Sequence, residues 1–244
     1  MENTKIGSAS FSVVSVVIHI YNEARCLERT LRQLKSLTKY GCNPELIVVD
    51  EGCTDQSMAI ARKYADVIVP YDGGVLSFGK ARNKGAEASS GKFIFFVDPD
   101  VLVPFDTYLM SIILLADNFD AVTCNLRVHP ERELFMDRFM HELLNLRYRL
   151  LGSGCGDFLA VRREVFAASK GFREDLESVE DNEYVYRLSR MGFKVGCLPS
   201  NYYVYESPCR YRLYTYAFTY MYWTFNALKL LFGFRPAKYR RIHH

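Results

Sequence analysis

Three groups of carboxylate residues in this sequence have the spacing to act on a substrate or to hold a cation. An Asp-x-Asp triplet at the end of a strand can present oxygen atoms to a hard divalent cation, and a bound diphosphate can complete the coordination. A carboxylate can also take the proton of a hydroxyl group while that hydroxyl attacks an electrophile. The ordinary alternative is that such acids cap a segment or favour a helix N-terminus. The groups are Asp50-Glu51, Asp98-Pro-Asp100 and Glu180-Asp181.

The elements that must position these acids read as an open α/β sheet. Short apolar runs rich in β-branched or aromatic residues predict buried strands, and amphipathic or alanine-rich segments between them predict helices. This alternation implies right-handed crossovers and a mostly parallel sheet, in which ligands bind at the carboxyl ends of the strands. The expected strands are 11–20, 46–49, 67–69 and 92–97, and the expected helices are 27–37, the segment ending at 64, and 80–88, with Asn22 as an N-cap.

Beyond Pro104 the pattern is looser, but the alternation continues. The expected helices are 109–115, 131–150 and 180–191, the expected strands are 121–128, 158–161 and 193–198, and 152–156 is a glycine-rich loop. The sequence contains no internal repeat and no low-complexity linker. We therefore expect one α/β domain over residues 1–206 and an appendage over residues 207–244.

The appendage differs from the rest of the chain in charge and composition. It carries seven Lys or Arg residues and no acid, whereas residues 1–206 carry 24 bases and 28 acids. Its 16-residue uncharged stretch, 213–228, is too short and too rich in tyrosine to span a bilayer. Tyr, Trp and basic residues favour the membrane interface, so we expect a helix on a membrane surface. The alternative is a helix packed on the sheet or at a subunit interface. The excess of acids over bases in residues 1–206 argues against binding to nucleic acid.

The cysteines and the termini indicate the compartment. Seven cysteines are present, an odd number, and no two have C-x-x-C spacing, which argues against a disulfide framework and against a zinc site. The N-terminus lacks the basic and apolar regions of a secretory signal. We therefore expect a cytoplasmic protein that is peripheral on the cytoplasmic face of the membrane.

Six motifs occur in a recognisable order. They are Tyr21-Asn-Glu23, Asp50-Glu-Gly-Cys-Thr-Asp55, Gly79-Lys-Ala-Arg-Asn-Lys-Gly85, Asp98-Pro-Asp100, Gly156-Asp157 and Glu180-Asp-Asn-Glu183. In this order and spacing they resemble glycosyltransferase family 2, the inverting nucleotide-sugar transferases, over residues 12–198. The resemblance implies the GT-A fold, a Rossmann-like, mostly parallel sheet flanked by helices.

The resemblance also implies roles for individual residues. His19 and Tyr21 would lie against the base and ribose, and Asp50 would accept hydrogen bonds from uracil, our favoured base, or from guanine. Asp98 would bind the ribose and, together with Asp100, a Mn²⁺ or Mg²⁺ ion that carries the diphosphate. The remaining implied nucleotide-side residues are Glu23, Arg82 and Arg187.

On the acceptor side, the resemblance assigns the catalytic base to Asp181, with Glu180 beside it. The acceptor would be a glycan or a lipid-linked sugar, and direct displacement would invert the anomeric carbon. His129 or His141 could add a third metal ligand, but surface or core packing is the favoured explanation for both. Two rival functions are a non-catalytic nucleotide-sugar-binding subunit and a sugar nucleotidyltransferase; the second normally needs a glycine-rich loop after its first strand, where this chain has His19-Ile-Tyr-Asn-Glu23.

Three positions depart from the pattern of the family. His19 replaces a common Pro or Thr, and Glu51 and Cys53 stand in Asp-Glu-Gly-Cys where Asp-Asp-Gly-Ser is common. Pro99 also stiffens the Asp-x-Asp turn. The acceptor motif and the membrane helices of processive polysaccharide synthases are missing, which disfavours that activity. All of these assignments require residues near positions 50, 98–100 and 181 to lie together.

Overall fold

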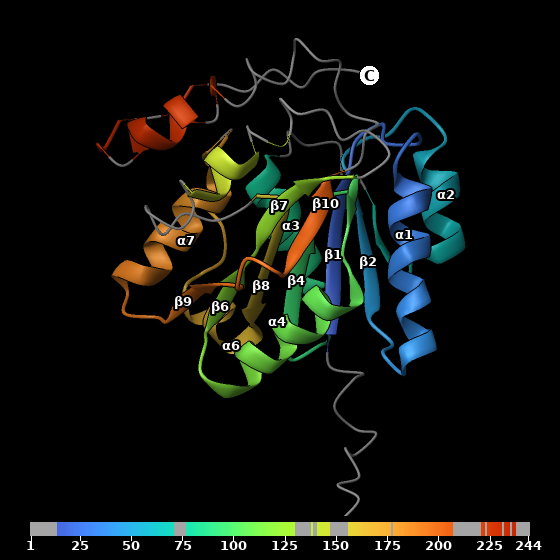
Figure 1. Ribbon diagram of the computed structural model, residues 1–244. Coiled ribbons are helices and arrows are strands. Elements are labelled where there is room, and N and C mark those ends of the chain that lie inside the picture. Colours follow the sequence, from blue (N-terminus) through green and yellow to red (C-terminus); the bar gives the residue numbers. More distant parts are fainter. Residues whose placement is uncertain are drawn as a thin grey trace, which may run out of the picture.

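A seven-stranded sheet forms the centre of the molecule (Figure 1). The computed structural model describes residues 14–70, 77–129, 138, 141–146, 156–176, 178–206, 221–222, 224–230, 232–234 and 236–237. Within the sheet only β8 runs antiparallel to its neighbours, so the expected mostly parallel sheet is confirmed. In spatial order the strands are β3 (Val67–Val69), β2 (Glu45–Asp50), β1 (Val14–Ile20), β4 (Phe93–Val97), β8 (Phe158–Arg162), β6 (Ala121–Thr123) and β9 (Val195–Cys197).

Alternate residues of the central strands face two separate hydrophobic cores. In β1, Val16 and Ile18 enter one core and Val17 enters the other, as the two-residue period of a strand requires. Helices cover both faces, which is why these strands are apolar without interruption. The first core lies under α1 (Leu27–Ser36), the 3₁₀ turn η1 (Leu37–Tyr40), α2 (Ser57–Tyr64) and α4 (Phe105–Asp117), and the second under α3 (Phe78–Glu87), α6 (Arg163–Ala168) and α7 (Glu180–Arg190).

The start of α1 corrects the expected role of Asn22. The helix begins at Leu27, after the N-cap residue Cys26. Asn22 instead has a left-handed backbone with a φ of 57°, and its Oδ1 accepts a hydrogen bond of 2.8 Å from the backbone N–H of Thr54. Asn22 therefore joins the turn after β1 to the turn after β2. This contact between segments 32 residues apart cannot be read from a local capping pattern.

A second, three-stranded sheet was not expected. It contains β5 (Val101–Leu102), β10 (Tyr203–Glu206) and β7 (Asn125–Val128). The single strand expected at 121–128 is divided at Cys124, because β6 pairs with β8 in the main sheet and β7 pairs with β10 in the small one. Helix α6 was also not expected. The proposed domain boundary after residue 206 stays a prediction.

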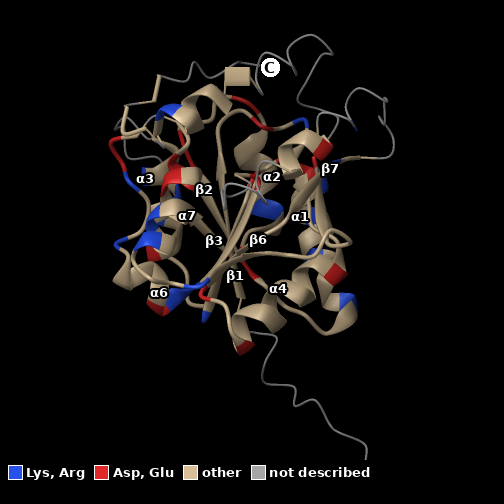
Figure 2. Ribbon diagram, turned by 60° about the vertical axis from the view of Figure 1, so that its left-hand side comes forward, with Lys and Arg blue, Asp and Glu red and all other residues tan. Residues whose placement is uncertain are grey.

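Several expected features lie wholly or partly outside the described residues, namely the loop at Gly73-Gly74, most of the helix 131–150 and the loop 152–155; residues 141–146 are helical. None of the described helices is both long and apolar enough to cross a bilayer. Charged residues lie on the helices and at strand ends, and the strands themselves carry few (Figure 2).

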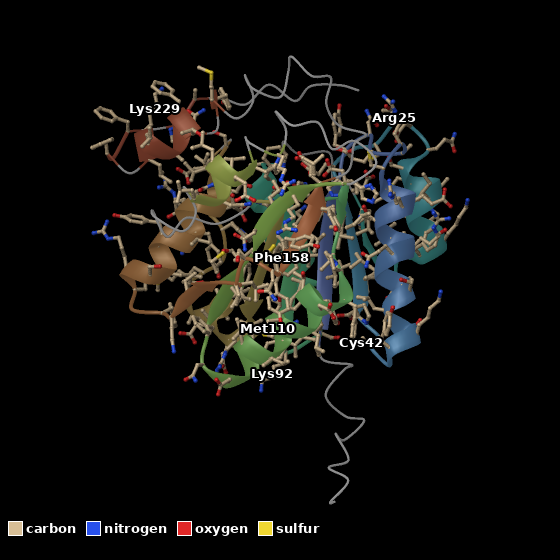
Figure 3. The ribbon with its side chains drawn as sticks, viewed as in Figure 1. Arg25, Cys42, Lys92, Met110, Phe158 and Lys229 are labelled. Carbon is tan, nitrogen blue, oxygen red and sulfur yellow. The ribbon has the colours of Figure 1, made fainter. Side chains whose placement is uncertain are left out.

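We call the described residues of the appendage, 221–222, 224–230, 232–234 and 236–237, the C-terminal segment; Lys229 in it lies at the carboxyl-end side of the sheet. In Figure 3, Lys229 and Arg25, which follows β1, mark one end of the molecule, whereas Cys42 and Lys92, which precede β2 and β4, lie toward the other. Residues 221–222 and 224–230 are helical. The segment therefore shares an end of the molecule with the polar residues that follow β1, β2 and β4.

Candidate active site

The polar residues at the ends of β1, β2 and β4 contact one another through His19. Its Nδ1 lies 2.7 Å from Oε1 of Glu51, and its Nε2 lies 3.5 Å from Oδ1 of Asp98. His19 and Glu51 are both buried. Two of the residues that depart from the family pattern therefore contact each other, and a buried carboxylate such as Glu51 needs such a partner to offset its lost hydration.

Arg82, on α3, links this group to α7. Its Nη2 donates hydrogen bonds of 3.1 Å to Oδ1 of Asp98 and to the carbonyl oxygen of Gly156, and its Nη1 donates to Oε1 of Glu180. The guanidinium is buried, so its two acidic partners supply the compensation that burial of a charge requires. Through one side chain, residues 98 and 180 are held together although they are 82 positions apart.

Asp181 lies beside the same guanidinium. A Cβ atom on Gly156 would come within 2.7 Å of Oδ2 of Asp181, so the glycine leaves the space that this carboxylate occupies. Asn182 donates a hydrogen bond of 2.9 Å to the same oxygen. The electrostatic fields of Arg82 and Asp98 both act on Asp181. The sequence requirement that positions 98 and 181 lie together is therefore met.

Burial changes the proton affinity of this cluster. Loss of hydration raises the pKa of Glu180 to about 7, although Arg82 opposes the shift. Burial likewise raises the pKa of Asp181, again against Arg82. Burial alone would lower the pKa of His19, but its contacts with Asp98 and Glu51 raise it to about 9. His19 is therefore an imidazolium between two carboxylates at neutral pH, and groups with such shifts are typical of functional sites.

The backbone just before Glu180 is strained. Val179 has a φ of 54°, in the left-handed region, and α7 has no side-chain N-cap. A β-branched residue in this region is an outlier that costs about 1–3 kcal/mol and persists only where the surroundings impose it. This strained residue directly precedes Glu180 and Asp181, the first two residues of α7.

Asp50 and its neighbours form the turn after β2. Oδ1 of Asp50 accepts hydrogen bonds from the backbone N–H groups of Gly52, at 3.0 Å, and Cys53, at 2.9 Å. Glu51 follows directly, so this turn reaches the cluster through His19. Tyr21 is half-buried beside it, and the backbone N–H of Glu23 donates to Oγ of Ser57 at 2.7 Å. Nucleotide contacts for Tyr21, Glu23 and Asp50 stay predictions.

Arg187 lies outside the group of contacts around Arg82. Its Nε donates to Oε1 of Glu183 at 2.9 Å, and its other N–H groups donate to the carbonyl oxygens of Ser169 and Gly171. These bonds fasten the turn after α6 to α7. The expected pairing with an acid is present, and contact with phosphates stays a prediction.

The donor atoms at the end of β4 suit a hard cation. Asp98 and Asp100 flank Pro99 in a tight turn in which the N–H of Val101 donates to the carbonyl oxygen of Asp98 at 3.2 Å. Mg²⁺ and similar ions often take one or two carboxylates and complete their shell with phosphate oxygens and water. Over the described part of the chain, no three His, Cys, Asp or Glu residues form a metal-binding group. The residues present thus fit an ion bound jointly with a diphosphate.

The histidines considered as a third ligand have other partners. Nε2 of His129 lies 2.9 Å from Nη2 of Arg29, and Nε2 of His141 lies 3.2 Å from Oε2 of Glu206. His141 and Glu206 are buried together at the end of the small sheet. Their geometry is consistent with the packing alternative.

The comparison with protein families decides the relationship. The family model described as Glycosyl transferase family 2 matches residues 15–169. The chain belongs to glycosyl transferase family 2. Among its relatives, glycosyltransferase AglD of Haloferax volcanii is 30% identical over 203 residues, which cover 76% of this chain and 32% of AglD. EpsH of Bacillus subtilis, a putative glycosyltransferase, is 34% identical over 118 residues, which cover 46% of this chain and 33% of EpsH.

This family-2 chain spans about a third of the length of the first curated relatives that it matches. Solved structures agree on its fold. The mannosyltransferase PcManGT of Pyrobaculum calidifontis, solved with GDP-Man and Mn²⁺, has a TM-score of 0.71 at 19% identity, and the match covers 93% of this chain and 66% of PcManGT. TarS of S. aureus, solved with UDP-GlcNAc, has a TM-score of 0.63 at 20% identity, and the match covers 82% of this chain and 59% of the TarS chain. The expected GT-A fold is confirmed.

Two features of the site were not anticipated from the sequence. The first is the pairing of His19 with Glu51, which two departures at the ends of adjacent strands could have suggested. The second is the close approach of Gly156 to Asp181, for which a glycine at the end of a loop gives no distinctive signal. Arg82 was expected to approach the nucleotide, and its contacts with both Asp98 and Glu180 add a structural role.

Proposed function

We propose that this chain catalyses transfer of a sugar from a nucleoside diphosphate to an acceptor hydroxyl, with inversion at the anomeric carbon. The observation that carries the proposal is the bridge made by Arg82, which holds Asp98, at the proposed donor side, next to Glu180 and Asp181, at the proposed acceptor side. A donor bound at the strand ends would have its sugar between these two sides. Family membership supports the reaction class.

Asp181 is proposed as the base. Its carboxylate would accept the proton of the acceptor hydroxyl while the oxygen attacks the sugar from the side opposite the leaving diphosphate. Its raised pKa makes it a stronger proton acceptor than an ordinary Asp, provided that it is ionised. Arg82 would hold Glu180 and Asp98 in place during the step, and Asn182 would orient the oxygen that it contacts. A divalent cation held by Asp98 and Asp100 would supply electrostatic stabilisation of the leaving group.

The favoured donor is a UDP-sugar, with a GDP-sugar as the alternative. The support is Asp50, because a carboxylate at the end of β2 can accept hydrogen bonds from the ring N–H of either base. TarS was solved with UDP-GlcNAc and PcManGT with GDP-Man, so neighbours of this fold include both kinds of donor. A thermal-shift screen of UDP- and GDP-sugars with Mn²⁺ would rank them, because binding to the native state raises the melting temperature.

The variant Asp181→Asn tests the proposed base. It should lower kcat by about 10²–10⁴-fold, the usual contribution of a positioned base, while the donor-induced thermal shift is retained. Asp175→Asn is the matched control, because Asp175 is exposed and pairs with Arg173. In the unchanged protein, kcat should fall on acidification with an apparent pKa above the ordinary value of about 4, because burial raises the pKa of Asp181. Near-normal turnover of Asp181→Asn would move the base to another residue.

We further propose a lipid-linked acceptor, reached from a membrane surface. The support is the exposure of large apolar side chains in the C-terminal segment, where Phe225, Phe232 and Phe234 are 59%, 76% and 66% exposed. Nζ of Lys229 lies 4.8 Å from the centre of the Phe225 ring, so positive charge and apolar surface occur together, as anionic bilayers favour. Lys229 lies at the same end of the molecule as Arg25, which follows β1 (Figure 3).

Flotation with vesicles that contain anionic phospholipid tests the membrane contact. The full chain should float with such vesicles, and the double variant Phe225→Ser/Phe232→Ser should remain at the bottom of the gradient. The double variant Tyr40→Ser/Met191→Ser, which also removes two exposed apolar side chains but elsewhere on the surface, is the control. Equal flotation of both double variants, or none by the unchanged chain, would rule out this surface.

A further inference from the structure

The C-terminal segment is fastened to the residue that precedes the strained start of α7. The carbonyl oxygen of Ala237 accepts hydrogen bonds from Oγ of Ser178, at 2.9 Å, and from the hydroxyl of Tyr222, at 2.8 Å. The N–H of Ala237 donates to Oδ1 of Asn226 at 2.7 Å. We call these four residues the C-terminal clasp. Both backbone polar groups of Ala237 are thus bound by side chains, and these side chains come from two distant parts of the chain.

Two of the clasp residues are buried and two, Tyr222 and Ala237, are half-buried, although apolar side chains nearby are exposed. Ser178 and Asn226 have no solvent-accessible surface, whereas Phe232 is 76% exposed. Asn226 also donates from Nδ2 to the carbonyl oxygen of Tyr222, four residues earlier, at 3.0 Å, so two clasp residues on the helical stretch are bonded to each other. A buried side-chain hydrogen bond that fixes backbone is a strong local constraint, because breaking it leaves polar groups without water. The segment is therefore held at the clasp, while the side chains of Phe225, Phe232 and Phe234 are exposed.

Ser178, which bonds to the C-terminal segment, lies just before the helix that carries Glu180 and Asp181. A serine just before a helix commonly caps it, yet the hydroxyl of Ser178 donates to Ala237 and α7 has no side-chain cap. Val179 follows with its left-handed backbone, and its carbonyl oxygen accepts the first helical hydrogen bond, from the N–H of Glu183 at 3.0 Å. Ser178 is therefore separated by a single residue, Val179, from the first turn of α7, which contains Glu180 and Asp181.

We infer that Ser178 is a positioning residue through which the C-terminal segment and the first turn of α7 are coupled. A ligand bound against Glu180 and Asp181 changes the environment of the segment, and a surface that binds the segment changes the placement of Asp181. The inference rests on the proposed function for the identity of that ligand, a nucleotide-sugar donor, but the coupling itself does not need catalysis. It adds a regulatory contact to the site, since docking of the segment would favour the working position of the base.

The single tryptophan of the chain allows a direct test. Trp223 lies in the sequence beside Tyr222, so its fluorescence reports on the segment without an added probe. The unchanged protein is titrated with UDP-sugar, and in parallel with GDP-sugar, in the presence of Mn²⁺. We expect the emission of Trp223 to change and to saturate at the concentration that saturates the thermal shift. Ser178→Ala and Tyr222→Phe should lose this change while the donor affinity stays within about 2-fold.

Ser189→Ala is the matched control. Ser189 lies in α7, the helix that follows Ser178, and its Oγ donates to the carbonyl oxygen of Val185 at 3.2 Å. The variant therefore removes one hydroxyl group without changing a clasp residue. It should respond as the unchanged protein does. In turnover, Ser178→Ala and Tyr222→Phe should lower kcat by about 5-fold, as expected for loss of one hydrogen bond, with little change in the donor KM. A merely structural serine would change the melting temperature but leave the emission response intact.

Amide hydrogen exchange tests the coupling through Ser178 independently of the proposed nucleotide-sugar donor. At residues 183–185, Ser178→Ala and Tyr222→Phe should raise amide exchange by about 5-fold over Ser189→Ala, with or without donor. If no nucleotide-sugar raises the melting temperature, the proposed donor is wrong, and the exchange result still decides the coupling. The coupling is overturned if exchange is unchanged in both clasp variants, or if donor binds and Trp223 does not respond in the unchanged protein.

Discussion

The cluster at the strand ends buries charged side chains, whereas the C-terminal segment exposes large apolar ones. The cluster buries His19, Glu51, Arg82 and Glu180, which are residue types that ordinarily stay in water. The segment exposes Met221, Phe225, Phe232 and Phe234, which ordinarily fill a core. Lys229 of the segment and Arg25, which follows β1, lie at the same end of the molecule (Figure 3), and the C-terminal clasp bonds the segment to Ser178, two residues before Glu180.

Neither arrangement is the most stable use of these side chains. A buried ion pair is often no better for stability than a well-packed apolar pair of the same size, because dehydration offsets the attraction. An exposed apolar surface forgoes the free energy that its burial would supply. Violations of this kind are expected where function, rather than folding, determines the residue. The comparison therefore points to the charges as the site and to the apolar surface as the place where something binds.

The largest effect on stability is expected from Arg82→Met. This change leaves the buried Glu180 and the half-buried Asp98 without their shared counterion, so the free energy of unfolding at pH 7 should fall by about 3–5 kcal/mol. Urea unfolding followed by circular dichroism measures it. The loss should be smaller near pH 5, because the raised pKa of Glu180 lets that carboxyl bind a proton in the folded state.

Arg62→Met is the control for this change, because Arg62 lies exposed on α2. It should alter the free energy of unfolding by less than about 0.5 kcal/mol. If Arg82→Met costs no more than Arg62→Met, the guanidinium does not compensate the acids in the way that its hydrogen bonds indicate.

An intermediate effect is expected from the pair of His19 and Glu51. A double-mutant cycle with His19→Thr and Glu51→Gln should give a coupling free energy of about 1.5–3 kcal/mol, the usual range for hydrogen bonds to charged groups. The pair of Lys35 and Asp66, with Nζ 2.8 Å from Oδ1, is the control. It is solvent-exposed, so its cycle, with Lys35→Met and Asp66→Asn, should give less than about 1 kcal/mol.

The pH dependence of this coupling sharpens the comparison. The folded-state pKa of His19, about 9, exceeds its ordinary value of 6.5, so the stabilisation from its charge is fully present below 6.5. It is lost as the pH rises through about 9, where the folded protein releases the proton. The double-mutant cycle of His19 and Glu51 should therefore show a coupling free energy near pH 6 but not near pH 10. Equal coupling at both values would mean that His19 does not release a proton between pH 6 and pH 10, contrary to its raised pKa.

The sequence predicts the two regions unequally. Strands β1 to β4 and helix α7 follow from apolar runs and helical periodicity, because packing on both faces of a parallel sheet leaves a strong local pattern. Asp98 and Asp181 could be assigned to one site because ordered motifs specified them. Contacts between distant segments could not be derived, since the hydrogen bond of Ser178 to Ala237 leaves no local pattern. The prediction of one strand over 121–128 was wrong because its two halves pair with strands of different sheets, and those partners are distant in the sequence.

The smallest effect on stability is expected from the exposed phenylalanines. Phe225→Ser and Phe232→Ser should each change the free energy of unfolding by less than about 0.5 kcal/mol, because neither ring loses much buried surface. Phe95→Ala, in the core of β4, is the contrast and should cost about 3–5 kcal/mol. A cost above about 2 kcal/mol for Phe232→Ser would show that its ring is covered in solution by another part of the chain or by a second copy. The apolar surface would then belong to an interior, and the opposition between the two regions would disappear.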